Sequence, residues 1–173
     1  MVRRYPKTLS SGENNTVIAI SETEDGKLFS GDTRSDIGSE AEKMKFANNV
    51  NNLAVKFIRL DIDESSNSDM LVMERLYPMD FRAYEVGKRE LWFDVFEDEL
   101  KELHKVGFIH GHIKRSDNLS QMYDNVFQTN KGFKLIDTGR SVLKNSVSES
   151  QFKRNLNIEL EDVKEFKEYF LSR

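Results

Sequence analysis

The chain has 173 residues, of which 38% are hydrophobic and 32% charged, and its formal net charge is −4. Twelve phenylalanines and five tyrosines supply enough core material to exclude a wholly disordered chain. The absence of cysteine excludes disulfide scaffolds, thiolate zinc sites and cysteine nucleophiles. The charge is acidic, no apolar run could cross a membrane, and no secretory signal opens the chain. We therefore expect a cytoplasmic protein that binds no nucleic acid and has no membrane span.

An antiparallel sheet with one helix is predicted for the first 75 residues. Asp25-Gly26 is a strong hairpin signal, and Ser39 and Glu42 have the spacing of a capping box at the start of a helix. The elements expected here are, in chain order, a strand over 16–20, a returning strand over 27–30, a helix from Ser39 to the asparagines at 48–52, and strands over 53–62 and 70–73.

Helices are predicted to dominate the remaining residues. Phe96, Leu100 and Leu103 share one helical face, and Gly107 fits the position after a helix that favours a left-handed backbone. The elements expected here are a helix over 91–106, a short apolar segment at 108–109, a hairpin of strands over 126–129 and 133–136, a polar linker over 144–155 and a helix over 156–170.

Three motifs, in this order, resemble those of protein kinases. Residues 70–76 resemble the strand and hinge that join the two kinase lobes, residues 103–114 the helix and catalytic loop, and residues 133–139 the strand that ends in Asp-Phe-Gly. The resemblance implies an α+β, two-lobed kinase-like fold. Its N-lobe, over 1–75, would hold an antiparallel sheet and one helix, and its C-lobe, over 76–173, would be truncated and mainly helical.

The Gly-rich loop of kinases, which must approach phosphates closely, falls on residues near the N-terminus. It corresponds to Ser10, Gly12 and Asn15, followed by Val17, so that only the middle glycine is kept. A Cβ atom at Ser10 and Asn15 limits the approach of the backbone to phosphate. The resemblance therefore implies weak nucleotide contacts at Gly12 and Val17.

Other nucleotide-binding positions fall on the following strands and helix. The third-strand lysine corresponds to Asp32, where an acid would repel phosphate, while Lys27 is expected to lie elsewhere. Glu42 falls where the kinase helix glutamate belongs, with a capping or surface role as the alternative. Glu74 and Leu76 correspond to the hinge beside the nucleotide.

The catalytic loop departs most from the kinase pattern. His112 stands where kinases have the catalytic aspartate, and an imidazole differs from a carboxylate in geometry and charge. Asp137 matches the metal-binding aspartate. Asn125 matches the metal-binding asparagine if residues 115–123 are an insertion, and Asn118 is the alternative.

The last helix contains a further resemblance at Glu161-Asp162-Val163. These residues resemble the start of the kinase helix whose aspartate braces the catalytic loop, and an ordinary amphipathic helix is the alternative. No Ala-Pro-Glu motif follows Asp137-Thr138-Gly139. In this respect the chain is similar to the minimal effector kinases of pathogenic bacteria and to truncated kinase mimics of viruses.

The resemblance and its departures predict a pseudokinase that acts by protein–protein interaction. Its partner would be a kinase or another signalling component, met in the cytoplasm of a host if the chain is a pathogen effector. ATP and magnesium are expected to bind weakly or not at all. Two alternatives stay open. One is an atypical, active, minimal Ser/Thr kinase, in which Asp117 or Asp124 replaces the missing carboxylate and Lys27 or Lys114 the missing cation. The other is a plain α+β domain whose motifs match by chance.

Overall fold

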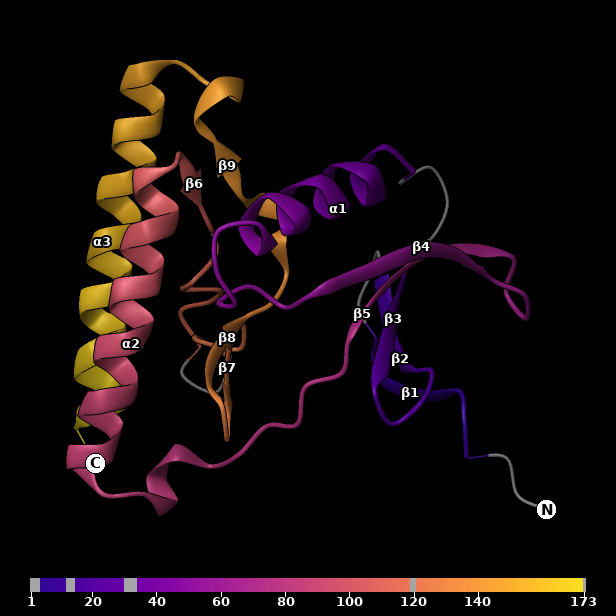
Figure 1. Ribbon diagram of the computed structural model, residues 1–173, viewed down its shortest axis with the longest axis horizontal. Helices are drawn as coiled ribbons and strands as arrows, with labels where there is room; N and C mark the ends of the chain where they lie inside the picture. Colours follow the sequence, from indigo (N-terminus) through magenta and orange to yellow (C-terminus); the bar gives the residue numbers. More distant parts are fainter. Residues whose placement is uncertain (1–3, 12–14, 30–33, 119–120, 173) are drawn as a thin grey trace.

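A five-stranded sheet with one helix, and a pair of long helices with a hairpin, form the two main parts of the molecule (Figure 1). The computed structural model describes residues 4–11, 15–29, 34–118 and 121–172. The sheet part contains β1 (Lys7–Ser11), β2 (Asn15–Ala19), β3 (Glu24–Phe29), α1 (Arg34–Asn48), β4 (Phe57–Asp63) and β5 (Ser68–Glu74). The helical part contains the 3-10 helices η1 (Phe81–Ala83), η2 (Thr138–Arg140) and η3 (Lys144–Ser146), the helices α2 (Val86–Lys105) and α3 (Glu149–Leu171), and the strands β6 (Phe108–Ile109), β7 (Val126–Thr129), β8 (Gly132–Leu135) and β9 (Val142–Leu143).

The sheet has the strand order β1-β2-β3-β5-β4, and every neighbouring pair is antiparallel. Helix α1 packs on it through Ile37, Ala41 and Met44, whose spacing places them on one helical face. These side chains form a small core with Phe29 and Leu71 of the sheet. Helix α1 therefore lies against the sheet, on the side that faces the long helices (Figure 1).

Aromatic side chains fill the core of the helical part. Phe93 and Phe96 of α2 meet Phe166 and Phe170 of α3, and Phe133 of β8 packs against Phe170 with ring centroids 4.5 Å apart. Tilted and edge-on contacts of this kind are favourable beyond the area that they bury. They fix the β7–β8 hairpin, and the loops before and after it, on the helix pair.

Backbone hydrogen bonds join the two parts. Leu135 of β8 accepts a bond from the Val55 N–H (2.8 Å) and donates one to the Leu53 carbonyl (2.8 Å). The Met79 N–H donates to the Gln128 carbonyl (2.9 Å). The sheet and the hairpin are thus held in a defined relation, which sets the space between them.

Asp25-Gly26 does not form the predicted hairpin turn. Both residues lie inside β3, where Gly26 pairs with Ile18 and Val72, and the turn is made instead by the residues before Glu24. Gly26 serves close packing, because a Cβ atom there would lie 2.5 Å from Met70 Sδ. Strand β3 therefore begins at Glu24, and Lys27 lies within it.

The long helices begin earlier than predicted. Helix α1 begins at Arg34, so that Ser39 lies in its interior and the predicted capping box is wrong. Helix α2 begins at Val86, and α3 begins at Glu149 after Ser148, whose side chain accepts a hydrogen bond from a backbone N–H. The first turns of these helices lack regularly spaced apolar residues, so the apolar periodicity did not indicate where the helices begin.

Several predicted elements are confirmed. Strand β5, the β7–β8 hairpin and the end of α2 at Gly107, with a φ of 94°, lie where the sequence predicts them, whereas the strand predicted over 53–62 begins only at Phe57. The α+β class is confirmed. No helix in the described ranges is long and apolar enough to cross a membrane.

Candidate functional site

A buried lysine joins two carboxylates where the two parts of the molecule meet. Lys27 Nζ of β3 lies 3.0 and 3.1 Å from the two carboxylate oxygens of Glu40 in α1, and 3.4 Å from Asp137 Oδ1. The side chains of Lys27 and Glu40 are 8% and 4% exposed, whereas that of Asp137 is 36% exposed. The lysine and one acid are therefore enclosed, and the second acid faces an open space.

The charges of this cluster shift one another's pKa values, and for Glu40 burial, with the nearby Asp137, outweighs Lys27 and raises the pKa. Burial acts to lower the pKa of Lys27, but Glu40 and Asp137 outweigh it, so that the pKa is raised. Burial likewise acts to raise the pKa of Asp137, but the charge and hydrogen bond of Lys27 outweigh it and hold that pKa below its usual value. At neutral pH the lysine is a cation and Asp137 an anion.

Asp137 also has an uncommon backbone conformation. It follows β8 with φ 60° and ψ 71°, in the left-handed region that non-glycine residues rarely adopt. Such outliers persist where the surrounding structure imposes them, and they cluster at functional sites. The geometry turns the Asp137 carboxylate toward Lys27.

The lysine at the site comes from β3 and is Lys27, whereas the resemblance aligned Asp32 with the third-strand lysine. The prediction that Lys27 lies away from the site was wrong. It placed the hairpin turn at Asp25-Gly26, so the strand was expected to begin at residue 27 instead of Glu24. Asp32 lies outside the described residues. The glutamate of α1 that pairs with Lys27 is Glu40, which is 3% exposed, whereas Glu42, to which the resemblance assigned this position, is exposed on the opposite side of α1.

His112 and Asn125 lie on the other side of Asp137. His112 Nδ1 is 3.9 Å from Asp137 Oδ2, and the Asn125 side-chain amide donates to the His112 carbonyl (3.0 Å) and contacts His112 Nδ1 (3.3 Å). Thus three residues predicted from the catalytic-loop resemblance lie together. The backbone N–H of Asn118 donates to Ser116 Oγ within its own loop.

The surroundings of His112 favour a neutral imidazole and one of its two tautomers. Burial lowers the pKa of His112, and Arg140 lowers it further, outweighing the opposite effect of Asp137. Since an amide NH₂ can only donate, the contact from Asn125 favours the tautomer in which Nδ1 accepts and the ring proton is on Nε2. The nitrogen nearest Asp137 is therefore already occupied by a hydrogen bond.

Glu159 of α3 holds this loop in place. Its carboxylate accepts hydrogen bonds from the backbone N–H groups of His110 (3.0 Å) and Gly111 (2.8 Å), and it lies 2.7 Å from His104 Nε2. Glu159 is only 2% exposed. The bracing acid is therefore Glu159, one helical turn before Asp162, the residue to which the resemblance assigned this role.

A mostly apolar cavity of about 390 Å³ lies along the segment that joins the two parts, and Ile136, the residue before Asp137, is among its lining residues. Val17, Glu74 and Leu76, all predicted nucleotide-binding residues, line it together with Met73 and Phe127. Gly12 lies outside the described residues. The enclosed space has one apolar wall from the sheet and one from the β7–β8 hairpin.

Comparison with known proteins adds no relative. No protein-family model matches the chain, and no curated protein matches its sequence significantly. The assignment of the site therefore depends on its own geometry.

Metal ligands are few in the cluster. No group of three or more His, Asp or Glu side chains able to hold a metal ion occurs in the part of the chain that the structure describes. Asp137 and Asn125 alone could supply oxygen ligands here, so a metal ion would need the remaining ligands from a bound molecule or water.

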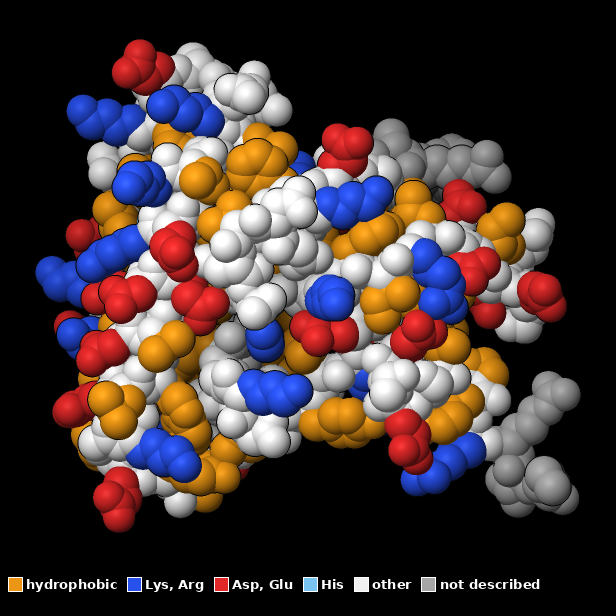
Figure 2. Space-filling view, viewed as in Figure 1, with side chains coloured by type: hydrophobic (Ala, Val, Ile, Leu, Met, Phe, Trp, Pro, Cys, Tyr) orange, Lys and Arg blue, Asp and Glu red, His pale blue; other side chains and the backbone are white. Residues whose placement is uncertain are grey.

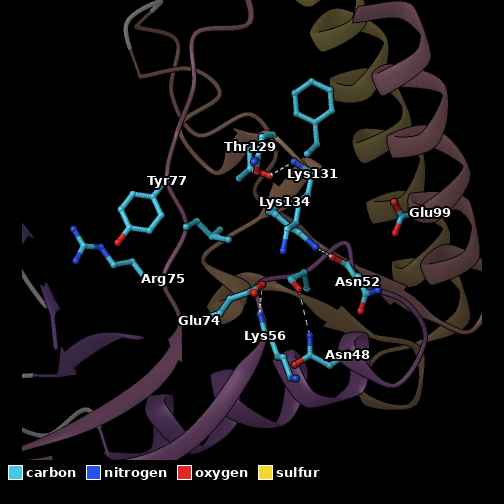
Figure 3. A pocket seen from close by; sticks show the side chains of 14 residues that line it. Asn48, Asn52, Lys56, Glu74, Arg75, Tyr77, Glu99, Thr129, Lys131 and Lys134 are labelled. Atoms are coloured by element: carbon cyan, nitrogen blue, oxygen red, sulfur yellow. Dashed lines mark hydrogen bonds between the residues drawn. The ribbon is translucent and has the colours of Figure 1, made fainter. Parts of the chain in front are cut away.

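A larger hollow of about 580 Å³ lies elsewhere, and Figure 3 shows its lining. It shares Glu74, Arg75, Leu76 and Tyr77 with the apolar cavity, and the cluster residues line neither space. Lys56, Lys131 and Lys134 line it, and the Lys134 amine donates to the Asn52 carbonyl. Because its polar groups are exposed or paired with one another, we assign the chemistry to the cluster of Lys27, Glu40, Asp137, His112 and Asn125, named the cleft cluster below.

Proposed function

We propose that the protein is a kinase-like pseudokinase that has kept a nucleotide-binding site and acts through contact with a protein partner. The order of the parts supports this proposal: a two-stranded hairpin, a lysine paired with a helix glutamate, a joining segment, a braced loop, an asparagine and an aspartate. Phosphoryl transfer in protein kinases uses these parts in this order.

The cleft cluster fits a nucleoside triphosphate with magnesium. Lys27 is a buried cation that would hold phosphate oxygens, and Glu40 would keep it oriented. Asp137 and Asn125 would hold the metal ion, and the apolar cavity would take the base. The nucleotide supplies a transferable phosphoryl group and the metal ion offsets its charge.

The contact between Asn125 and His112 is the main support for the proposal that phosphoryl transfer is impaired. A base that receives the proton of a hydroxyl must have an accessible acceptor atom. In His112 the accepting nitrogen, Nδ1, is engaged by Asn125, and the other nitrogen carries a proton. Neither nitrogen is therefore a free acceptor, unlike the oxygens of a carboxylate.

The charge distribution agrees with a protein partner better than with a nucleic acid. Acidic and basic side chains are interspersed over the face seen in Figure 2. Nucleic-acid binders usually present a continuous basic surface to the phosphate backbone. We propose a kinase or another signalling protein as the partner.

Calorimetric titration and a phosphotransfer assay test the two parts of this proposal. We expect magnesium-dependent binding of ATP or GTP to wild type, at least ~10-fold weaker binding to Lys27→Met, and an unchanged affinity for Lys101→Met, which alters an exposed lysine. We expect no phosphate transfer by wild type to itself or to an acceptor protein, and detectable transfer by His112→Asp. Absence of nucleotide binding would contradict the first part.

An active minimal Ser/Thr kinase is the second candidate, and the intact Lys27–Glu40 pair favours it. In that case wild type would transfer phosphate, and both Asp137→Asn and His112→Ala would lose the activity. That result would overturn the pseudokinase proposal while leaving nucleotide binding in place.

A further inference from the structure

A buried carboxylate faces the apolar cavity at its sheet side. Asp25 lies in β3, two residues before Lys27, so both side chains point to the same face of the sheet. Its cross-strand neighbours are Ala19 of β2 and Met73 of β5. Asp25 is 9% exposed and lines the cavity. Most of the lining is apolar, and Glu74 and Arg75 are the other charged residues in it.

The Asp25 carboxylate lacks a full set of partners. Its Oδ1 atom is buried and accepts no hydrogen bond from the described residues. Arg75 Nε forms an ion pair with this same Oδ1 at 3.8 Å, beyond hydrogen-bond distance, while Arg75 Nη1 donates to the Ser21 carbonyl (2.9 Å) and the Tyr5 hydroxyl (3.3 Å). Burial raises the pKa of Asp25 to about 6, against the opposing effect of Arg75. At neutral pH most of the population is an anion that only accepts hydrogen bonds.

A buried acceptor without a donor is costly, and a ligand that supplies the donor relieves that cost. Sites built around such a group reject close analogues that leave it unpaired. The cavity is large enough for a planar ring system, and its walls are mostly apolar. A ligand that combines a planar ring with N–H groups directed at Asp25 would fit it.

We propose that Asp25 selects guanine over adenine in this cavity. Guanine carries an N1–H and a 2-amino group side by side, and a carboxylate accepts from both at once. Adenine presents a bare acceptor nitrogen at the equivalent N1 position, which a carboxylate repels. This inference rests on the proposed function, because it specifies the base of the nucleotide whose phosphates Lys27 holds.

Titration of the magnesium complexes of GTP, ITP and ATP into wild type tests the inference. Hypoxanthine in ITP keeps N1–H but lacks the 2-amino group. We expect GTP to bind at least ~10-fold more tightly than ATP, with ITP between them. Asp25→Ala should bind GTP and ATP with similar affinities, whereas the exposed Asp94→Asn control should keep the preference for GTP.

The outcomes separate this inference from the function on which it rests. Equal affinities of wild type for GTP and ATP, both lowered by Lys27→Met, would overturn the selection by Asp25 and support nucleotide binding. A preference for GTP that persists in Asp25→Ala would also overturn it. Circular dichroism and thermal melting establish that each variant is folded. Failure of every nucleotide to bind folded wild type would overturn both.

Discussion

The two sides of the cleft cluster differ in the charge of their central residue and in how that residue is paired. On the sheet side, Lys27 is enclosed and directly paired with Glu40 and Asp137. On the helical side, His112 is neutral, and its near nitrogen is engaged by Asn125. The first side contains a buried cation held by two acids, whereas Arg140 acts on His112 from nearby. Under the proposed function, this difference would suit binding more than proton transfer.

The largest expected effect tests whether Glu159 holds the loop on the helical side of the cleft cluster. Glu159→Ala would leave two buried backbone N–H groups and His104 without their acceptor. We expect the free energy of unfolding to fall by about 3–5 kcal/mol, measured by urea denaturation. Glu161→Ala, which removes an exposed acid two residues away, should change it by less than about 0.5 kcal/mol. Similar small losses for both variants would show that Glu159 does not hold the loop.

The next effect tests the sheet side. Lys27→Met would leave Glu40 buried without its cation, and we expect a loss of about 3 kcal/mol at pH 7. Because a buried Glu40 can then take up a proton, the loss should shrink as the pH falls toward 4. Denaturation at both pH values, with Lys101→Met as the control, measures this. A loss that does not depend on pH would argue against the buried ion pair.

Asp25 should give a smaller effect with the opposite dependence on pH. Its folded pKa of about 6 lies above the usual value of 3.8, so the folded state binds the proton more tightly than the unfolded state does. Its contribution to stability is therefore full below pH 3.8 and is lost as the pH rises through 6. Relative to wild type, Asp25→Asn should gain on the order of 2 kcal/mol between pH 4 and pH 7.5. A constant difference across that range would contradict a buried, under-paired carboxylate.

The smallest effect compares two glycines that share a left-handed backbone. A Cβ atom at Gly111 (φ 84°) would lie 2.4 Å from the Arg140 carbonyl oxygen, whereas at Gly132 (φ 110°) it would meet nothing within 4 Å. Both alanine variants should lose stability, and Gly111→Ala should lose about 1 kcal/mol more. Equal losses would mean that the chain at Gly111 tolerates a Cβ atom close to the Arg140 carbonyl oxygen.

Local patterns in the sequence predicted much of the fold. Met70–Met73, the β7–β8 hairpin and Gly107 were found because each has a strong local cause: a buried apolar run, a short turn and a left-handed glycine. The hairpin turn predicted at Asp25-Gly26 was wrong because the sequence alone does not distinguish a glycine in a strand from a glycine in a turn. Only the packing of Met70 over Gly26 distinguishes them.

The candidate site was predicted better in its helical half. Asp137 and Asn125 are tied to the ends of a recognisable hairpin, so their positions followed from it. Lys27 was expected at the site only in the alternative of an active kinase, and Glu40 was not expected there, because their pairing depends on the register of β3 and on the start of α1. A helical turn separates Glu159 from Asp162, and only the tertiary packing of α3 decides which one reaches the loop.

The central claim is that Lys27 serves a nucleotide site in a cleft that does not transfer phosphate. Calorimetric titration of magnesium-bound GTP and ATP into wild type, Lys27→Met and Lys101→Met tests it most directly. We predict binding to wild type and to Lys101→Met, and affinity at least ~10-fold weaker for Lys27→Met. Absence of binding to wild type, or equal affinities for wild type and Lys27→Met, would contradict it.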